Sequence, residues 1–354
     1  MVPSFTKIHN KFKFNNTHFN ADTLKEAAYS FVKEGELYQK HIGSFLLDWL
    51  DSNDYVFVKT SGSTGKPKQI SLQKQAMVAS AITTGDYFNI ESGSKALHCL
   101  PTEFIAGKMM LVRSMILGLE IDVVKPTLNP LEKIAKYYDF CAMVPLQLEK
   151  SIDKLHHVST LIVGGSSVSN ALQTQLQDIS CKVYATYGMT ETMTHIAVKQ
   201  LNHLEEVSLD IFQTLPNITI SKDSRDCLVI NAPKLSDMPI VTNDVIELLS
   251  DRSFKLLGRI DNVINSGGIK LFPEQIEAKL KNNIHTRFFI ASKLHSSLGE
   301  QLIMIIEGVL NTVDTSAFKN LNKYEIPKHV YTVERFIETD SGKIQRKKTL
   351  ALLK

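Results

Sequence analysis

Residues 60–68 combine small hydroxyl side chains, glycines and lysines in a pattern that could bind a polyphosphate. They read Thr60-Ser61-Gly62-Ser63-Thr64-Gly65-Lys66-Pro67-Lys68 and follow the β-type run 55–58. Glycines let the backbone turn so that several N–H groups face one anion, while the hydroxyls and lysines add donors and charge. A flexible surface turn is the alternative. A Walker P-loop is excluded, because no Lys-Ser/Thr pair follows a glycine at the start of a helix.

Further segments place chemically capable side chains along the rest of the chain. In order they are Gly164-Gly165-Ser166, Tyr187-Gly188-Met189-Thr190-Glu191-Thr192, Thr242-Asn243-Asp244, Gly258-Arg259-Ile260-Asp261, Gly267-Gly268-Ile269-Lys270 and Asp340-Ser341-Gly342-Lys343-Ile344. Taken singly, Asp244 and Arg259 fit a surface ion pair, and Lys343 fits ordinary surface charge. Their significance lies in their joint order.

Together these segments resemble the adenylate-forming superfamily of acyl- and aryl-CoA synthetases, luciferases and peptide-synthetase adenylation domains. The resemblance runs from about residue 55 to 350, in the order that the family shows. It implies an ATP-dependent acid–CoA ligase that needs ATP, Mg²⁺ and CoA. A carboxylic acid would first form an acyl-AMP and release pyrophosphate; the thiol of CoA would then form the thioester and release AMP.

The resemblance also implies which residues bind the nucleotide. Those expected to hold the phosphates are Thr60, Ser61, Gly62, Ser63, Thr64, Gly65, Lys66 and Lys68. Those expected around the adenine and the α-phosphate are Gly164, Gly165, Ser166, Tyr187, Gly188 and Met189. Tyr187 would stack on the adenine, although a buried core tyrosine is the alternative. Asp244 would accept hydrogen bonds from the ribose hydroxyls with help from Arg259; the family commonly has glycine where Asn243 stands.

Three residues are expected to act on the reacting groups. By resemblance, Lys343 bridges the carboxylate and the α-phosphate, and Thr190 donates to the α-phosphate. Glu191 is the expected Mg²⁺ ligand, because a hard cation takes one or two carboxylates together with phosphate oxygens. A solvated loop glutamate is the alternative for Glu191.

A second set is expected to serve the thiol step. The family rotates its C-terminal domain about a hinge residue, here Asp261, which would withdraw Lys343. Gly267 and Gly268 would then line the pantetheine channel, and Lys270 would contact CoA phosphates. The alternatives are a plain turn for the glycines and a surface lysine for Lys270.

The block that follows Leu100 carries the expected acid pocket. Within the superfamily this block, the short chain and residues 187–192 most resemble the o-succinylbenzoate–CoA ligases of menaquinone biosynthesis. That acid has two carboxylates, so one needs a cation or donors beyond the reacting centre. The expected acid-site residues are Phe104, Gly107, Lys108 and His195, with Lys108 preferred over Arg113 as the cation. Core packing for Phe104 and an exposed helix position for Lys108 are the alternatives.

Other functions also fit the motifs. Another aryl- or acyl-acid ligase, using CoA or a carrier protein, would run the same two half-reactions. A nucleotide-binding homologue without turnover is the second alternative, against which the retained Glu191, Asp244, Arg259 and Lys343 argue.

The element pattern predicts an α/β fold with two domains. Residues 21–50 have a helical period, and β-type runs at 96–100, 121–124, 140–144, 161–163 and 182–184 alternate with helical patterns. This order favours parallel βαβ units with ligand loops at the carboxyl ends of strands. From about residue 208, short runs predict an antiparallel β subdomain. We expect an adenylate-forming domain at 1–260 and a small mobile α+β cap at 261–354, with a helix from Pro273 to about Asn282.

Composition limits the class of protein. The chain has 354 residues, 43% apolar and 22% charged, with a net charge of +3, which is too small to argue for nucleic acid or a membrane surface. Four scattered cysteines without a CxxC pair predict buried thiols. No signal-peptide pattern and no apolar run of 18 residues is visible, so we expect a cytoplasmic protein without membrane insertion. Only 59 residues precede the phosphate loop, where the family has well over a hundred; this shortening could expose an apolar patch that a homodimer covers.

Overall fold

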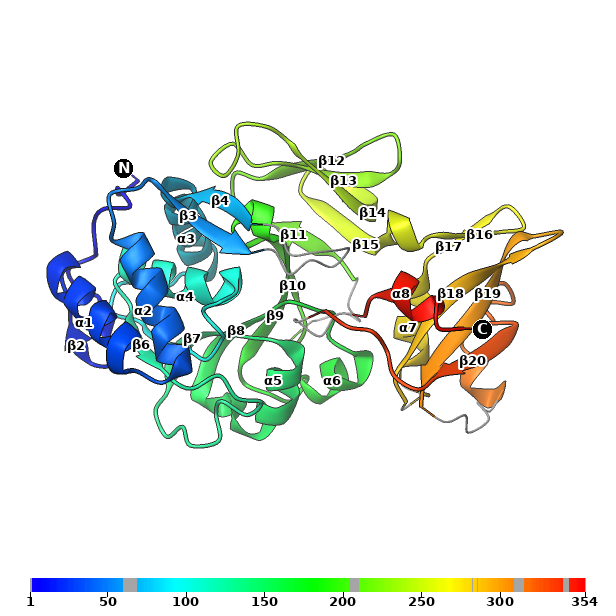
Figure 1. Ribbon diagram of the computed structural model, residues 1–354, viewed down its shortest axis with the longest axis horizontal. Helices are drawn as coiled ribbons and strands as arrows, with labels where there is room; N and C mark the ends of the chain where they lie inside the picture. The colour runs from blue at the N-terminus through cyan, green and yellow to red at the C-terminus, as the bar shows by residue number, and fades with distance from the viewer. Residues whose placement is uncertain are drawn as a thin grey trace.

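The structure is a computed structural model that describes residues 2–59, 69–203, 210–281, 283–284, 286–308, 315–339 and 344–353. It contains a large α/β unit and a smaller C-terminal unit (Figure 1). Helices α1 (Ala21–Glu34) and α2 (Leu37–Trp49) lie at the end of the molecule away from the C-terminal unit. Asn20 caps α1, its Oδ1 accepting from the Thr23 N–H at 2.9 Å, and the helix ends before Gly35. The predicted helical stretch is therefore two helices.

One sheet of 13 strands runs through the whole large unit. Its parallel half contains β1 (Lys13–Phe14), β6 (Glu120–Val123), β5 (Lys95–His98), β7 (Tyr138–Met143), β8 (Val158–Val163) and β9 (Lys182–Gly188). The short β2 (Thr17–His18) pairs antiparallel with β1 at the edge. All five βαβ strands expected from the sequence are present and parallel.

The parallel half is covered on both faces, which is why its strands are almost wholly apolar. Successive residues alternate between two cores: Phe140 faces one and Cys141 the other. Helices α3 (Lys74–Phe88) and α4 (Ile105–Leu117) contribute to the first core, with α1 and α2. The second core takes side chains from α5 (Pro145–Ser151), the 3₁₀ helix η1 (Ile152–His157) and α6 (Asn170–Gln175). All four cysteines are buried and free, as predicted.

The antiparallel half continues the same sheet without a break. After β9 it adds β10 (His195–Gln200), β11 (Phe212–Thr214), β15 (Ser253–Arg259), β14 (Ile240–Ser250), β13 (Cys227–Asn231) and β12 (Thr219–Lys222). The antiparallel strands predicted from about residue 208 are therefore confirmed, but they extend the main sheet through β10. A separate hairpin pairs β3 (Tyr55–Lys59) with β4 (Gln69–Gln73).

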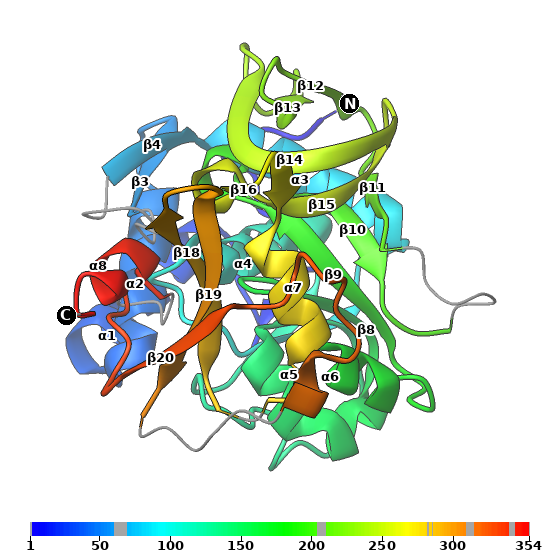
Figure 2. The same ribbon diagram turned by 90° about the vertical axis from the view of Figure 1, so that its right-hand side faces the viewer.

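The C-terminal unit has its own five-stranded sheet. It comprises β17 (Ile269–Leu271), β16 (Ile264–Ser266), β19 (Gly299–Glu307), β18 (Phe288–His295) and β20 (His329–Val333), the last parallel to β19. Helix α7 (Pro273–Leu280) and the 3₁₀ turn η4 (Thr315–Phe318) join the core on one face, while α8 (Arg346–Leu350) lies over the other. Figure 2 shows α7 and α8 on either side of these strands.

The two sheets are joined by the 3₁₀ turn η3 (Ile260–Asn262). Arg259 is the last residue of β15 in the large sheet, and Ile264 is the first of β16 in the small one. Asp261, the expected hinge residue, therefore lies between the two sheets. In the described part of the chain, no helix is long and apolar enough to cross a membrane.

Candidate functional site

Two of the expected nucleotide segments lie at the carboxyl ends of neighbouring parallel strands. Gly164 follows β8, and Tyr187 and Gly188 end β9. The two segments touch, because a Cβ on Gly164 would lie 2.5 Å from Oγ1 of Thr186. Gly165 has φ +91°, a conformation that favours glycine, and Ser166 beside it is exposed. This edge of a parallel sheet is where such folds place their ligands.

The residues after β9 form a compact turn. The 3₁₀ turn η2 covers Thr190–Thr192; Glu191 is exposed and Thr192 fully buried. The Thr192 hydroxyl accepts from the Met189 N–H at 3.0 Å and lies 2.7 Å from the carbonyl of Thr194. Met193 has φ 61° and ψ −44°, and the Thr194 N–H lies 2.6 Å from the Thr192 carbonyl. These values describe a γ-turn with positive φ, which is rare and strained.

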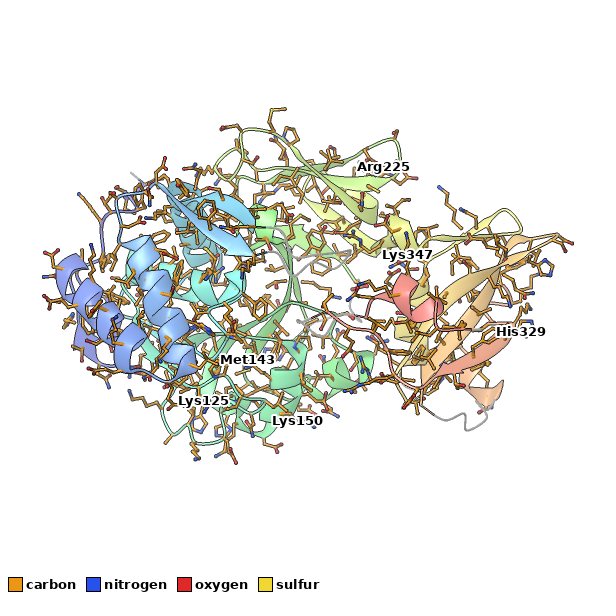
Figure 3. The ribbon with its side chains drawn as sticks, viewed as in Figure 1. Lys125, Met143, Lys150, Arg225, His329 and Lys347 are labelled. Atoms are coloured by element: carbon orange, nitrogen blue, oxygen red, sulfur yellow. The ribbon has the colours of Figure 1, made fainter. Side chains whose placement is uncertain are left out.

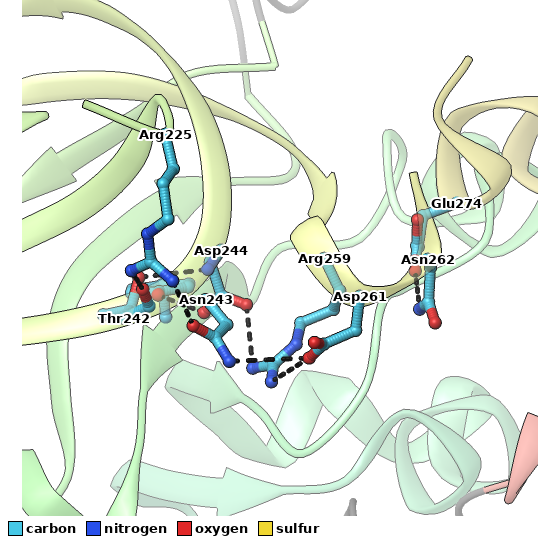
Figure 4. Close-up of polar contacts among 9 residues, drawn as sticks. Arg225, Thr242, Asn243, Asp244, Arg259, Asp261, Asn262 and Glu274 are labelled. Atoms are coloured by element: carbon cyan, nitrogen blue, oxygen red, sulfur yellow. Dashed lines mark hydrogen bonds and ion pairs between the residues drawn. The ribbon is translucent and has the colours of Figure 1, made fainter. Parts of the chain in front are cut away.

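Asp244, itself buried, is the centre of a polar cluster whose other charged members are partly exposed (Figure 4). Its side chain accepts a hydrogen bond from the Tyr187 hydroxyl at 2.5 Å and from Nη1 of Arg259 at 3.1 Å. The Tyr187 ring packs edge-on against Phe212 and Phe254, and burial raises the pKa of its hydroxyl well above the ordinary value. Tyr187 thus occupies the buried position that the core alternative describes. The structure brings these three expected residues together.

The same cluster reaches the hinge residue. Asp261 Oδ2 accepts from Nη2 of Arg259 at 3.4 Å and lies 3.5 Å from Nδ2 of Asn243. Arg225 completes the group by donating to Asn243 Oδ1 and to the Thr242 carbonyl, both at 3.1 Å (Figure 4). Arg225 belongs to the antiparallel half, whereas Lys347 lies on α8 of the smaller unit (Figure 3). The expected ribose and hinge residues are therefore in direct contact.

The expected acid-site residues do not share one set of neighbours. Phe104 precedes α4 and is 39% exposed, so it is not a core residue. Gly107 packs so closely that a Cβ would lie 2.4 Å from the Pro101 carbonyl. Lys108 is half-buried; its Nζ donates to the Thr102 carbonyl at 2.8 Å and lies 5.0 Å from the ring centroid of Phe45 in α2, and burial lowers its pKa. Its ammonium is thus already occupied.

His195 lies apart from Lys108, at the start of β10. Its Nε2 is 3.5 Å from the Thr84 hydroxyl and its Nδ1 is 3.5 Å from Nη2 of Arg113. Burial, and then the charge of Arg113, lower the pKa of His195 well below its ordinary value. His195 is therefore neutral at physiological pH and cannot by itself neutralise a carboxylate.

The expected CoA-channel residues form a hairpin turn. Gly267 (φ 57°) and Gly268 (φ 84°) connect β16 to β17, and both positive φ values suit a two-residue turn. Lys270 is exposed on β17. This is the geometry of the plain-turn alternative.

Two expected segments lie outside the described residues. These are the phosphate loop, 60–68, and residues 340–343 with Lys343. Their flanks are described: Lys59 pairs with Gln69 across the β3–β4 hairpin, and Glu338 forms a bridge with Ile344.

The sequence did not predict the surroundings of two charged residues, Arg113 and Arg346. Arg113 was rejected in favour of Lys108, yet it is buried in α4, among Met109–Ile116, which are all buried. A lone arginine in an apolar helix was the available signal. Arg346 is not among the residues that the sequence singles out, but its guanidinium contacts both carboxylate oxygens of Glu277 at 2.6 and 2.8 Å. Nothing local to its sequence indicates that partner.

Comparison with known proteins finds one matching family model and relatives that share one name. The model of the AMP-binding enzyme family matches residues 15–221. A 2-succinylbenzoate–CoA ligase of Lactococcus lactis is 23% identical, over 93% of this chain and 78% of the relative. A 2-succinylbenzoate–CoA ligase of Staphylococcus epidermidis is 25% identical, over 82% of this chain and 68% of the relative.

Solved structures of similar fold include an acyl-CoA synthetase-like protein and an o-succinylbenzoate coenzyme A synthetase. An acyl-CoA synthetase (AMP-forming)/AMP-acid ligase II-like protein of Dyadobacter fermentans is 34% identical, covers 93% of this chain and 98% of its own, and has a TM-score of 0.61. The o-succinylbenzoate coenzyme A synthetase of Bacillus subtilis, solved with ATP and magnesium, has a TM-score of 0.75 at 19% identity, over 83% of this chain and 69% of its own. The family match covers more than half of the sequence, and so the chain belongs to the AMP-binding enzyme family.

Proposed function

We propose that this protein is an ATP-dependent, AMP-forming acid–CoA ligase whose acid is o-succinylbenzoate. The observation that carries the proposal is the buried Asp244 carboxylate, held by Tyr187 and Arg259 beside the carboxyl end of β9. A buried carboxylate held in this way is suited to accept two hydroxyl hydrogens, as a ribose would offer.

The first half-reaction would join an acid oxygen to the α-phosphorus of ATP and break the bond to the leaving pyrophosphate. Positioning and charge neutralisation supply nearly all of the catalysis in such a transfer. We assign Lys343 to the developing charge between carboxylate and α-phosphate, and Thr190 to an α-phosphate oxygen. Residues 60–68 would bind the leaving β- and γ-phosphates. In the second half-reaction the CoA sulfur would attack the acyl carbon and AMP would leave.

Glu191 fits the expected magnesium ion. It is exposed at the carboxyl end of β9 and has no ion pair within the described ranges. No cluster of three or more metal-ligating side chains occurs among the residues described. One carboxylate together with phosphate oxygens is a usual Mg²⁺ environment, and the bound ion would neutralise phosphate charge. Glu191 would orient it.

The acid is proposed from the relatives. Two curated relatives are named for 2-succinylbenzoate, and the Bacillus subtilis synthetase has also been solved with its OSB-AMP intermediate. Another aryl- or acyl-acid substrate is the second candidate, favoured by the chemistry around Lys108, whose ammonium is occupied by the Thr102 carbonyl.

The two half-reactions would require rearrangement about the hinge. We propose that residues 1–260 and 261–354 act as two domains and that Asp261 is the pivot. Rotation would withdraw Lys343 and bring Gly267, Gly268 and Lys270 toward the CoA channel. We also propose a cytoplasmic location and a homodimer; sedimentation of the purified protein would measure the latter.

A thioester assay tests the function. The protein would be incubated with ATP, Mg²⁺, CoA and either o-succinylbenzoate, benzoate or a fatty acid, with pyrophosphate and thioester measured separately. We expect both products with o-succinylbenzoate and neither without acid. If pyrophosphate is released only with another acid, that acid is the substrate in place of o-succinylbenzoate. Nucleotide binding without any acid-dependent pyrophosphate release would indicate a non-catalytic homologue.

A further inference from the structure

His98 is a buried imidazole with a single polar side-chain contact in the described part of the chain. It is the last residue of β5 and is 1% exposed. Its Nε2 forms a hydrogen bond of 2.9 Å with Oγ1 of Thr102, whereas its Nδ1 is buried without a partner among the described residues. Burial lowers the pKa of His98 to about 4, so the imidazole is neutral at physiological pH. An apolar side chain would pack here without leaving a buried nitrogen unpaired, so the contact with Thr102 needs an explanation beyond core packing.

Thr102 is held from three sides. It is 3% exposed, although it lies in the loop between β5 and α4. His98 binds its hydroxyl, and Nζ of Lys108 donates to its carbonyl at 2.8 Å. A Cβ on Gly107 would lie 2.9 Å from Cα of Thr102, so the first turn of α4 packs on its backbone. Thr102 is thus the fixed point of this loop.

The two residues after Thr102 are exposed. Glu103 has its Oε2 3.3 Å from Nδ1 of His41 in α2, and the Phe104 side chain has no aromatic partner within the described ranges. The strands β5, β7, β8 and β9 are parallel neighbours, so this loop leaves the same edge of the sheet as the segments that follow β8 and β9. Thr102 therefore anchors an exposed aromatic ring at the edge where such folds place their ligands.

From this geometry we infer that His98 is a positioning residue for the acid, which holds Thr102 and thereby sets Phe104 as a wall of the acid site. The inference rests on the proposed function and on the expected contact between Phe104 and the acid. His98 itself is too deeply buried to touch a substrate. When its contact with Thr102 is lost, the loop is freed at its fixed point and Phe104 shifts. A displacement of about 1 Å can cost on the order of 10²-fold in rate.

The test compares four variants in acid-dependent pyrophosphate release. His98→Leu removes both ring nitrogens, whereas His98→Gln keeps an amide that can reach the Thr102 hydroxyl. Thr102→Val removes the hydroxyl, whereas Thr102→Ser keeps it. Thr214→Val is the matched control, because Thr214 is also 3% exposed and its hydroxyl donates at 2.9 Å to the Ile218 carbonyl, in the antiparallel half. Each variant is also melted to compare stability.

We expect His98→Leu and Thr102→Val each to lower kcat/KM for the acid by about 10-fold or more, through a higher KM for the acid. The KM for ATP should change by less than about 2-fold, because only the acid meets Phe104. The double variant should fall no further than either single one, since both remove one contact. His98→Gln should recover part of the loss, and Thr102→Ser most of it. Thr214→Val should lower the melting temperature without changing either KM.

Three results would overturn the inference. The first is a KM for the acid that rises no more in Thr102→Val than in Thr214→Val. The second is a loss confined to kcat, which is what a partly unfolded enzyme would show. The third is an additive double variant. If His98→Leu does not fold, the comparison of Thr102→Val with Thr102→Ser decides alone.

Failure of the proposed function would look different. The wild-type protein would then release no pyrophosphate with any acid. In that case the affinity for o-succinylbenzoate, measured by calorimetry in the presence of Mg-ATP, replaces the KM as the readout. A weaker affinity in Thr102→Val than in Thr102→Ser supports the inference. Equal affinities in the two variants, or no binding of the acid to the wild-type protein, contradict it.

Discussion

Replacing Arg346 by methionine tests whether one partly buried ion pair holds α8 against α7 and the C-terminal sheet. The Arg346 guanidinium donates to both carboxylate oxygens of Glu277 and to the Ile290 carbonyl at 3.0 Å. Its Cζ also lies 5.4 Å from the ring centroid of Phe289. Methionine keeps the helix and most of the apolar contact, so the substitution removes chiefly the charge and its donors.

The expected loss of stability depends on the contacts that Glu277 keeps when the Arg346 guanidinium is removed. The Glu277 side chain is 13% exposed and would keep the Ile290 N–H, at 2.7 Å from its Oε1, as its one described donor. Removing one partner of a fully buried pair costs about 3–5 kcal/mol. Arg346 and Glu277 are only partly buried, so we expect a smaller cost of about 2–3 kcal/mol, within the range for hydrogen bonds to a charged group. Arg346→Met should therefore lower the free energy of unfolding by about that amount. Glu277→Gln in the same chain should restore much of it, because no buried charge is then left unpaired.

Arg287→Met is the matched control. Arg287 belongs to the same unit, lies over Phe336 at 5.5 Å and pairs with Glu307 and Glu338, but its side chain is 49% exposed. Exposed pairs contribute about 0–1 kcal/mol, so this variant should change stability little. Urea unfolding followed by circular dichroism measures both. Equal destabilisation by the two substitutions, or a loss below about 1 kcal/mol for Arg346→Met, would refute the reasoning.

Further predictions concern catalysis and pH. Lys343→Ala should lower acyl-AMP formation by about 10²–10³-fold, measured as pyrophosphate release, while thioester formation from supplied acyl-AMP stays near normal. Asp244→Ala should raise the KM for ATP by about 10- to 100-fold, since a hydrogen bond to a charged group contributes about 1.5–3 kcal/mol; an unchanged KM would remove Asp244 from the nucleotide site. Burial lowers the pKa of His98 to about 4 from 6.5, so its folded form binds fewer protons than the unfolded chain. Stability is therefore complete above about pH 6.5 and falls by up to about 3 kcal/mol toward pH 4, and His98→Gln should flatten that decline in acid-unfolding curves.

The fold could be predicted where the hydrophobic periodicity of the sequence and the order of the elements along the chain determine it. The five parallel strands were found because each is a short apolar run between helical patterns, and burial on both faces requires that texture. The break between α1 and α2 was missed because apolar spacing continues across Gly35. The continuation of the parallel sheet into the antiparallel strands was also missed. It depends on β10, which pairs antiparallel with the adjacent β9 and was not among the strands expected from the sequence.

The candidate site could be predicted for side chains that belong to motifs in the order that the family shows. Tyr187, Asp244 and Arg259 were expected around one nucleotide and do meet. The preference for Lys108 over Arg113 used helix spacing alone. Spacing cannot reveal that Lys108 turns toward Phe45 of α2, whereas Arg113 turns toward Thr194, because both outcomes depend on which neighbours pack against α4.

The continuous sheet also limits how this enzyme can be recombined. A cut anywhere between β8 and β15 would leave two open strand edges with unpaired backbone groups, a template for aggregation. At residues 260–262 a cut severs no strand pairing between the two sheets. Chimeras that exchange the acid-recognising portion between related ligases should therefore be spliced at that turn, with the entire 13-stranded body transferred as a single piece.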